Sequence, residues 1–533
     1  MTKNTITRVQ SAILEVLSHE NTYVSLKDIM LKVGNISTGL RSMQKEITKL
    51  KHANRISTTG SAASTQYIIE DIQRVYPGYS FLYVYKNNII IGQLFKLDEQ
   101  YRFYYDNEYL AKYNQSIPTL PLRIESFDFE NIPAIFEENM LEGINREIDE
   151  VTHKTSDEFE LLARMDDSIG DLCFSRSKEK CFIEGELASN YMSSLDEILG
   201  ENPMINVLEV FEILIDEKEL FPEGYDLSKI EMKQTQGISG FQYKKLVNVD
   251  FKKRVITTNE KAHTYILKPY SRLKADSNND NYFPHISLNE HLHLSFAKNE
   301  LGFRVPYSAI VKSSIDDEYH YIVKRFDRLG TNRFAKSSFA AFLGLRSENK
   351  YDTTTEKMFK RIAKELISPK ERMELLKHYV YSSIIVHEDL HSKNLSIIYD
   401  KGKPLFAPLY DVCCTGIYDS TNGYESRLPI NGKQTNIRPN DYRGLCKLLN
   451  IEYKEFLIEA KKIALKYKTR MPLYFEEIEK LGDIPFYHKK QVKKRGYRDV
   501  TLKRDSEATQ FIVVLKEFHS KRVEKLEELG WID

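Results

Sequence analysis

The segment His387-Glu388-Asp389-Leu390-His391-Ser392-Lys393-Asn394 carries more chemical information than any other stretch of this 533-residue chain. Within it lie two imidazoles, two carboxylates, an ammonium group and an amide. The spacing of these groups satisfies two catalytic motifs that perform different chemistry. Only one motif can apply, and the choice depends on the local structure and on the groups found elsewhere in the chain.

In the first interpretation the segment is HxDLxxxN, the catalytic loop of a protein kinase. The carboxylate of Asp389 accepts the proton of the substrate hydroxyl, and the amide of Asn394 holds magnesium. Extended sequences on both sides of the turn at residues 400–403 predict a hairpin directly after the segment. Beyond this hairpin, Asp411 places a second carboxylate where a kinase has its metal-binding aspartate.

In the second interpretation His387, Glu388 and His391 form HExxH, in which two imidazoles one helical turn apart bind zinc and the glutamate activates water. Apolar residues from Tyr379 to Ile385 predict a helix that leads into the motif, which favours zinc. The hairpin predicted next does not, because a zinc hydrolase normally continues the helix past its second histidine. A polar loop that only caps the helix is a third interpretation.

Composition bounds the remaining possibilities. The length predicts two or three domains. Lys and Arg number 77, as do Asp and Glu, so nucleic-acid binding would require a local basic patch. The five cysteines form no CxxC pair, which is typical of reduced thiols in a cytoplasm. We expect a cytoplasmic protein, since the sequence shows no signal peptide and no apolar run long enough to span a bilayer.

Residues 1–72 are predicted to form a separate domain. Apolar residues at helical spacing indicate three helices, and two short extended runs around a polar tip indicate a hairpin. This order predicts a winged helix-turn-helix whose third helix is the candidate DNA reader, with Arg41, Lys45 and Lys49 as candidate DNA contacts. The alternatives are a solvated basic helix face and a winged helix that binds protein instead of DNA.

The rest of the chain is predicted to be α+β. Strands are expected at residues 79–85, 89–92 and 101–105, and helices near 130–165 and 203–220. A mixed region follows to about residue 335, with one clear helix near 287–301, and the chain beyond 338 is mostly helical. We therefore expect a β-rich part and nucleotide-binding lobe over 76–335, followed by a helical lobe with the catalytic segment over 336–533.

Other parts of a phosphoryl-transfer site can be sought upstream, because this chemistry mainly needs bound phosphates and cations that neutralise charge. Gly237, Ser239 and Gly240 form a loop whose backbone can approach phosphate oxygens, although an ordinary turn would have the same sequence. Lys268 ends an apolar strand, which is the position of a phosphate-pairing lysine. The alternative is a lysine whose ammonium group only extends to solvent. Glu290, near the start of the next helix, is the candidate to form an ion pair with Lys268. The alternative is an acid that only interacts favourably with the helix dipole.

A strand at residues 321–328 ends in alternating charges where a nucleotide-binding hinge is expected. The order along the chain is then glycine loop, strand lysine, helix glutamate, hinge, catalytic loop and metal aspartate. This order favours a kinase that uses ATP and magnesium.

At this point the chain resembles the HipA family of bacterial serine/threonine kinases, the toxins of HipBA-type toxin–antitoxin systems. The resemblance covers about residues 76–525 and rests on four motifs: an SxxGxQ-like loop at 238–242, RFDR at 325–328, D-x-H-x-K-N at 389–394, and the Tyr410-Asp411 pair. The first 75 residues or so lie outside the core family. They look like the DNA-binding extension that some HipA-like proteins carry in place of a separate antitoxin.

The resemblance implies a bilobal kinase fold of the α+β class with a mostly helical C-terminal lobe, preceded by a small winged helix-turn-helix domain. It also implies that Lys393 stabilises charge and that the backbone at Lys324 and Phe326 receives adenine. The chain departs from the family pattern at His387, where asparagine is frequent, and at Lys324, where glutamate is frequent. The serine that the family autophosphorylates falls on Gly237, which makes Ser239 the candidate phosphosite.

By this resemblance the chain would be an ATP- and magnesium-dependent serine/threonine protein kinase of the toxin type. The implied substrate is an aminoacyl-tRNA synthetase, and the implied partners are DNA and an antitoxin protein, with no membrane involved. A second hypothesis is a DNA-binding transcriptional regulator whose kinase-like domain only senses nucleotide.

Overall fold

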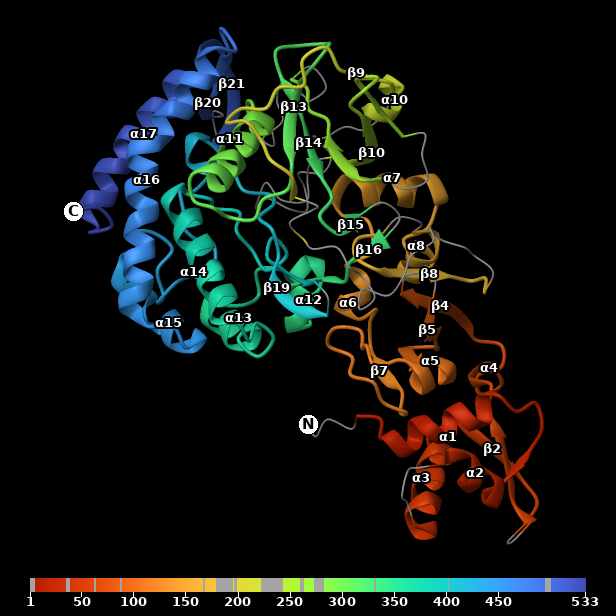
Figure 1. The fold of residues 1–533 in the computed structure, drawn as a ribbon. Helices are drawn as coiled ribbons and strands as arrows, with labels where there is room; N and C mark the ends of the chain where they lie inside the picture. The colour runs from red at the N-terminus through yellow and green to blue at the C-terminus, as the bar shows by residue number, and fades with distance from the viewer. Residues whose placement is uncertain are drawn as a thin grey trace. The chain divides into compact units, whose positions relative to one another are not determined.

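The computed structural model describes residues 5–34, 39–61, 64–86, 89–165, 168–178, 195, 199–221, 243–258, 263–272, 282–329, 332–400, 402–493 and 500–533. The chain folds as two compact units, Met1–Met140 with Ser156–Gly185 and Leu141–Thr155 with Glu186–Asp533. This division does not follow the expected boundaries at residues 72 and 335. Figure 1 labels the elements of both units.

The first unit begins with the three helices and the hairpin that apolar spacing predicts. The elements are α1 (Arg8–Ser18), β1 (Val24–Ser25), α2 (Leu26–Val33), α3 (Leu40–His52), β2 (Ile56–Thr59) and β3 (Gln66–Ile69). Strand β3 lies between β1 and β2 in an antiparallel sheet. Helix α1 starts with a capping box, in which Thr7 and Gln10 each accept a hydrogen bond from the other's backbone N–H.

An antiparallel sheet of order β7-β6-β5-β4-β8 forms the rest of the first unit. Its strands are β4 (Ser80–Lys86), β5 (Ile89–Lys96), β6 (Tyr101–Tyr105), β7 (Phe127–Phe129) and β8 (Leu172–Ser175), with helices α4 (Ile72–Val75), α5 (Asn107–Lys112), α6 (Ala134–Glu137) and α8 (Glu158–Arg164). Strand β5 requires glycine at residue 92, because a Cβ on Gly92 would overlap the Tyr104 carbonyl and the Phe103 ring on the neighbouring strand β6.

A fully buried arginine joins these two parts of the first unit. The Arg55 side chain, just before β2, donates to the carbonyls of Tyr105 and Ile124 at 2.6 Å each and to the Asn107 amide oxygen at 3.1 Å. Two of these acceptors are backbone carbonyls of the buried residues Tyr105 and Ile124. Arg55 therefore ties the first 72 residues to the sheet that follows them.

The second unit contains a six-stranded sheet of order β13-β14-β12-β10-β11-β9. Its strands are β9 (Glu212–Ile213), β10 (Lys245–Asp250), β11 (Val255–Thr257), β12 (Tyr265–Lys268), β13 (Ser308–Lys312) and β14 (Tyr319–Lys324). Helix α11 (Ile286–Asn299) packs against β13 and β14. Helix α7 (Gly143–His153) also belongs to this unit, although the chain on both sides of it belongs to the first.

The sequence predicts a helix near 203–220, and this prediction is wrong for most of the segment. Only α10 (Glu217–Leu220) is helical, whereas β9 pairs in parallel with β11. Phe211, Ile213 and Ile215 pack against the core under this sheet. These apolar residues recur at every second position, which is the pattern of a strand. Because the run is short, this pattern is easily confused with that of a helix.

Beyond the sheet the second unit is mainly helical, as expected. The helices are α12 (Phe339–Leu343), α13 (Thr355–Ile362), α14 (Pro369–Ile384), α15 (Arg443–Leu449), α16 (Tyr453–Glu479) and α17 (Phe511–Glu528). The strands of this part are β15 (Arg328–Leu329), β16 (Asn332–Arg333), β17 (Lys336–Ser338), β18 (Ser396–Asp400), β19 (Lys403–Phe406), β20 (Pro485–Lys493) and β21 (Val500–Gln510). The predicted hairpin after the catalytic segment is β18–β19.

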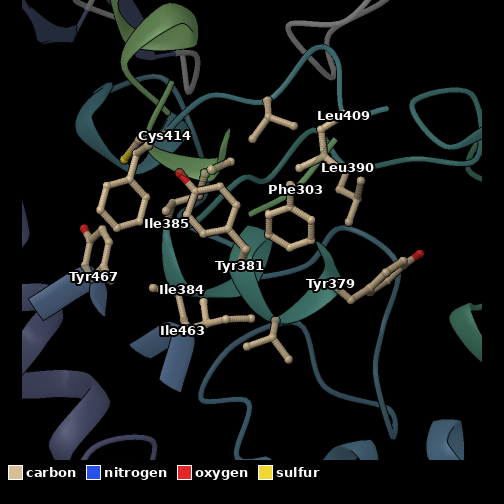
Figure 2. Close-up of a cluster of buried hydrophobic side chains, with 14 of the residues drawn as sticks. Phe303, Tyr379, Tyr381, Ile384, Ile385, Leu390, Leu409, Cys414, Ile463 and Tyr467 are labelled. Atoms are coloured by element: carbon tan, nitrogen blue, oxygen red, sulfur yellow. The ribbon is translucent and has the colours of Figure 1, made fainter. Parts of the chain in front are cut away.

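Helix α14 lies at the centre of this helical part, and α16 packs against both α14 and α17. Figure 2 shows the buried side chains that surround the end of α14, which include Tyr381, Ile384, Ile385, Phe303, Leu390, Leu409, Cys414, Ile463 and Tyr467. Helix α14 is buried on nearly all sides at its C-terminal end. The segment that follows it therefore starts from a fixed point in the core.

Arg55→Ala should destabilise the first unit by about 3 kcal/mol, because it leaves buried carbonyl groups without donors and creates a cavity. Arg74→Ala is the matched control, since Arg74 is exposed on α4. The measurement is amide hydrogen exchange across residues 5–134 with increasing urea. Equal protection of α1, α3 and β6 in the two variants would show that Arg55 does not join the two parts.

Candidate active site

The segment after α14 is a turn and not a helix. Helix α14 ends at Ile384, and Val386 takes a left-handed conformation with φ of 54°, which is costly for a β-branched residue. Thr415 holds this conformation, because its hydroxyl donates to the Val386 carbonyl at 2.6 Å and accepts from the Glu388 backbone N–H at 2.9 Å. Residues 386–388 are thus held to the loop that follows the β18–β19 hairpin.

The geometry does not support the zinc interpretation. The Glu388 carboxylate accepts from the Asn422 backbone at 2.8 Å, the Asn422 side chain at 2.7 Å and the Tyr424 backbone at 3.3 Å. Within the described ranges no three His, Cys, Asp or Glu side chains are grouped to hold a metal ion. His387 and His391 are both buried, and burial lowers the pKa of His387 to about 4. Glu388 thus positions the 422–424 loop.

Asp389 and Asn394 lie in two consecutive turns, 387–390 and 391–394. The Asn394 backbone N–H donates to the His391 carbonyl at 3.0 Å, and the Asn394 amide oxygen accepts from the His391 backbone at 3.3 Å. Both Asp389 and Asn394 are nearly buried. The Tyr351 hydroxyl donates to Asp389 Oδ1 at 2.6 Å. The predicted base and the predicted amide therefore belong to one ordered loop.

Lys393, the predicted charge stabiliser, is anchored at both ends. Its ammonium group forms an ion pair with Glu142, at the N-terminus of α7, and donates to the Ser347 hydroxyl at 2.8 Å. Its carbonyl accepts from the Tyr410 hydroxyl at 2.8 Å. Nothing in the sequence signals the Glu142 contact, because it joins residues far apart in the chain.

Lys268, Glu290 and Asp411 come together from three elements, as predicted for the strand lysine and the helix glutamate. The Lys268 ammonium, at the end of β12, donates to both Glu290 oxygens at 2.8 Å and forms an ion pair with Asp411. Burial alone would lower the pKa of Lys268, but the two carboxylates outweigh this effect and raise it. Burial raises the pKa of Glu290. Lys268 is therefore charged at neutral pH.

Asp411 also contacts a second lysine. Lys244 Nζ lies 3.7 Å from Asp411 Oδ2. Burial would raise the pKa of Asp411, but Lys244 and Lys268 hold it well below its ordinary value. Asn145 of α7 fixes the Lys244 backbone, accepting from its N–H at 3.2 Å and donating to its carbonyl at 2.8 Å. No role was predicted for Lys244, although it lies two residues after the predicted glycine loop.

Asn289, the neighbour of Glu290 on α11, holds the backbone beyond Asp411. Its side chain donates to the Cys414 carbonyl at 2.8 Å and accepts from the Cys414 N–H at 3.0 Å. It also donates to the Tyr418 hydroxyl at 3.0 Å. The adjacent residues of α11 thus fix Lys268 and the 411–418 loop together. Its position next to Glu290 was the only sequence signal for this role.

Lys350 lies near both predicted acids. Lys350 is close enough to both Asp389 and Asp411 for each to oppose the lowering of its pKa, which burial causes. His391 lies near the same groups, and burial lowers its pKa well below the ordinary value. The structure therefore brings the Asp389 turn and Asp411 to one site, with Lys268, Lys244 and Lys350 around it.

The predicted hinge residues lie beside this site. The Lys324 backbone N–H already donates to the Tyr307 carbonyl at 2.8 Å, and the Phe326 ring lies 5.6 Å from the Tyr410 ring. Arg325 and Arg328 are buried, and both bind the Asp327 carboxylate at 2.8–3.1 Å. In this motif the charged groups therefore stabilise the turn after β14. Gly237, Ser239 and Gly240 lie outside the described residues.

The candidate DNA contacts Arg41, Lys45 and Lys49 are all exposed on α3 of the first unit. Lys49 pairs with Glu46 at 2.8 Å, and Glu46 in turn accepts from Gln10 of α1 at 2.8 Å. The three basic residues are spaced one helical turn apart, so they share one face of α3.

Comparison with known proteins gives consistent matches. Residues 82–175 match the HipA N-terminal domain, and residues 236–477 match the HipA-like C-terminal domain. A putative kinase of Haemophilus influenzae is 25% identical over 269 residues, which cover 47% of this chain and 74% of that protein. The putative kinase Y4dM of Sinorhizobium fredii is 33% identical over 94 residues, covering 17% of this chain and 23% of that protein.

A solved structure shares the fold. It is the complex of HipA, HipB and operator DNA from a toxin–antitoxin system of Shewanella oneidensis, which matches with a TM-score of 0.58 and 15% identity. The match covers 84% of this chain and 97% of that one. Within the described residues, no helix combines the length and apolar character needed to cross a membrane.

Asn289→Ala should lower the free energy of unfolding of the second unit by about 2–4 kcal/mol, because buried groups of Cys414 lose their partners. Ser287→Ala is the matched control on the same helix, since the buried Ser287 hydroxyl has no hydrogen-bond partner among the described residues. Urea unfolding followed by tyrosine fluorescence measures both. Similar losses in the two variants would contradict the role of Asn289.

Proposed function

Because the chain belongs to the HipA-like family, we propose that it is an ATP- and magnesium-dependent serine/threonine protein kinase of the toxin type. The observation that carries the proposal is the network of Lys268, Glu290 and Asp411, which lies near the loop that holds Asp389 and Asn394. Phosphoryl transfer needs cations to hold phosphates, oxygen ligands for metal and a base near the acceptor hydroxyl. Each of these requirements has a candidate group here.

In this proposal Asp389 accepts the proton of the acceptor hydroxyl, and Lys268 and Lys393 hold phosphate oxygens. Asn394 and Asp411 fit magnesium, because amide and carboxylate oxygens are the donors that this ion prefers. Asp411 is ionised, since the neighbouring lysines hold its pKa well below the ordinary value. Magnesium, when bound, would neutralise the charge that develops on the transferred phosphoryl group.

The fold that we propose is a bilobal kinase with a mostly helical C-terminal lobe. The six-stranded sheet with α11 is the nucleotide-binding lobe, and α12–α17 make up the helical lobe. Lys324 and Phe326 would receive adenine through their backbone atoms, with the Lys324 carbonyl favoured because its N–H is already bonded. Ser239 remains the proposed phosphosite, and with Gly237 and Gly240 the proposed phosphate loop.

We further propose that the first unit binds DNA through a winged helix-turn-helix formed by residues 1–72. The order of three helices and a hairpin supports this, as do the exposed Arg41, Lys45 and Lys49 on α3. The solved complex with HipB and operator DNA supports DNA and an antitoxin protein as partners. An aminoacyl-tRNA synthetase is the proposed substrate class. Free buried thiols, including Cys413 and Cys446, support action in the cytoplasm.

Asp389→Asn should abolish phosphate transfer from ATP while leaving the Kd for ATP within about twofold, because the amide cannot accept the hydroxyl proton. Asp483→Asn is the matched control, since Asp483 is exposed. Incorporation of labelled phosphate and calorimetric ATP binding measure the two properties. Transfer by the Asp389 variant at the wild-type rate would exclude this residue as the base.

ATP binding without any transfer by the wild-type protein would instead favour the nucleotide-sensing regulator. An electrophoretic shift on the promoter of the chain's own gene, with and without ATP, would then test that hypothesis.

Replacing Arg41, Lys45 and Lys49 with alanine should weaken DNA binding and reduce the slope of log K against log salt by about 0.9 for each DNA phosphate that the variant no longer neutralises. The control replaces Lys454, Lys462 and Lys521, which are exposed in the second unit and change the net charge equally. Fluorescence anisotropy with duplex DNA at several salt concentrations measures both. Equal slopes in the two variants would exclude α3 as the DNA-binding element.

A further inference from the structure

One short segment touches the catalytic loop at three successive places. It comprises the 3-10 helix η4 (Ser347–Asn349) and the next two residues, Lys350 and Tyr351. The Ser347 hydroxyl accepts from Lys393, and the Lys350 carbonyl accepts from the Ser392 hydroxyl at 2.6 Å. The Tyr351 hydroxyl then donates to Asp389 Oδ1 at 2.6 Å. The segment thus follows the loop along its length, and its contact with the proposed base is made by Tyr351.

The Tyr351 ring is held so that its hydroxyl stays on this carboxylate. The ring lies edge-on to the His391 ring with centroids 5.2 Å apart. The Arg427 guanidinium lies over the Tyr351 ring at 5.3 Å from the centroid. Burial, and then the charge of Asp389, raise the pKa of Tyr351. The hydroxyl is therefore protonated at neutral pH and donates to the carboxylate.

A short hydrogen bond between a hydroxyl and a carboxylate is charge-assisted and is stronger than one between neutral groups. It favours the ionised form of the acid and fixes the plane of the carboxylate. A base for phosphoryl transfer must satisfy both conditions, because it has to be ionised and aimed at the acceptor hydroxyl.

We propose that Tyr351 is a positioning residue for phosphoryl transfer, which orients Asp389 and keeps it ionised through the hydrogen bond to Oδ1. This inference rests on the proposed kinase function. Tyr351 acts through Asp389 and takes no proton from the substrate itself. The 347–351 segment is then a support for the catalytic loop that no catalytic motif of the sequence marks.

Other groups close to Asp389 or to Tyr351 have to be held constant in a test. They are Lys350 on the same segment, Glu388 and His391 on the catalytic loop, Cys413 on the loop after β19, and Arg427 across the Tyr351 ring. Tyr351→Phe changes none of them and keeps the aromatic ring between His391 and Arg427. The substitution therefore isolates the hydroxyl.

Tyr351→Phe should lower kcat about tenfold while the KM for ATP stays within about twofold. The acidic limb of the pH profile of kcat should move to higher pH, because the ionised form of the base loses its donor. Tyr424→Phe is the matched control: its ring also lies near Arg427, and neither kcat nor the profile should change. The thermal unfolding midpoint of each variant identifies any loss that is only structural.

Infrared difference spectra between each protein and the same protein carrying Asp389→Asn follow protonation of this carboxylate without any turnover. We expect the midpoint of that titration to rise when Tyr351→Phe is introduced. An unchanged midpoint would overturn the inference, as would an unchanged kcat or a loss of kcat matched by a lower unfolding midpoint. Phosphate found on Tyr351 of the wild type would overturn it too, since Tyr351 would then be an acceptor.

The infrared titration separates this inference from the proposed function. A shifted titration in a protein that transfers no phosphate would support the coupling of Tyr351 to Asp389 and contradict the kinase function. An unshifted titration in an active kinase would contradict the role of Tyr351 alone.

Discussion

The buried ammonium group of Lys268 is the interaction on which the second unit depends most. It comes from β12, Glu290 from α11 and Asp411 from the loop after β19, so one cation joins the sheet, its helix and that loop. Lys268 and Glu290 are nearly inaccessible to water, and charges in such a place are costly unless they are paired. Loss of one partner leaves the others uncompensated, at a cost of about 3–5 kcal/mol.

The same logic applies to the other cations of the site. Lys244 is near Asp411, and Lys393 is paired with Glu142, so in this structure these lysines have protein carboxylates as partners. A metal–polyphosphate complex would require an exchange of partners at these residues, with phosphate oxygens for the lysines and a cation for Asp411. New pairs with phosphate and metal would offset part of the cost of separating the existing ion pairs.

The sequence predicted those parts of the site that depend on local pattern. The helix up to residue 384, the β18–β19 hairpin and the pairing of Lys268 with Glu290 follow from apolar spacing, turn residues and the order of motifs. The prediction of a helix near 203–220 was wrong, because a short alternating strand and a helix of the same length contain similar numbers of apolar residues.

Interactions between distant residues were not predictable in this way. Tyr351 with Asp389, Asn289 with Cys414 and Glu142 with Lys393 join residues that are separated by 38, 125 and 251 positions. No local periodicity encodes such pairs, because they are set by how whole elements pack. The link that Arg55 makes between residues 1–72 and the following part of the first unit was not predicted, for the same reason.

Helix α7 belongs to the second unit, but the chain enters and leaves it from the first. The chain leaves the first unit after Met140, forms α7 within the second, and re-enters the first at Ser156. Both ends of α7 are therefore linked through the chain to the first unit. At its N-terminal end Glu142 pairs with Lys393, and Asn145 binds the Lys244 backbone. Any change in the position of α7 would therefore alter the partners of two lysines that belong to the same unit, Lys393 and Lys244.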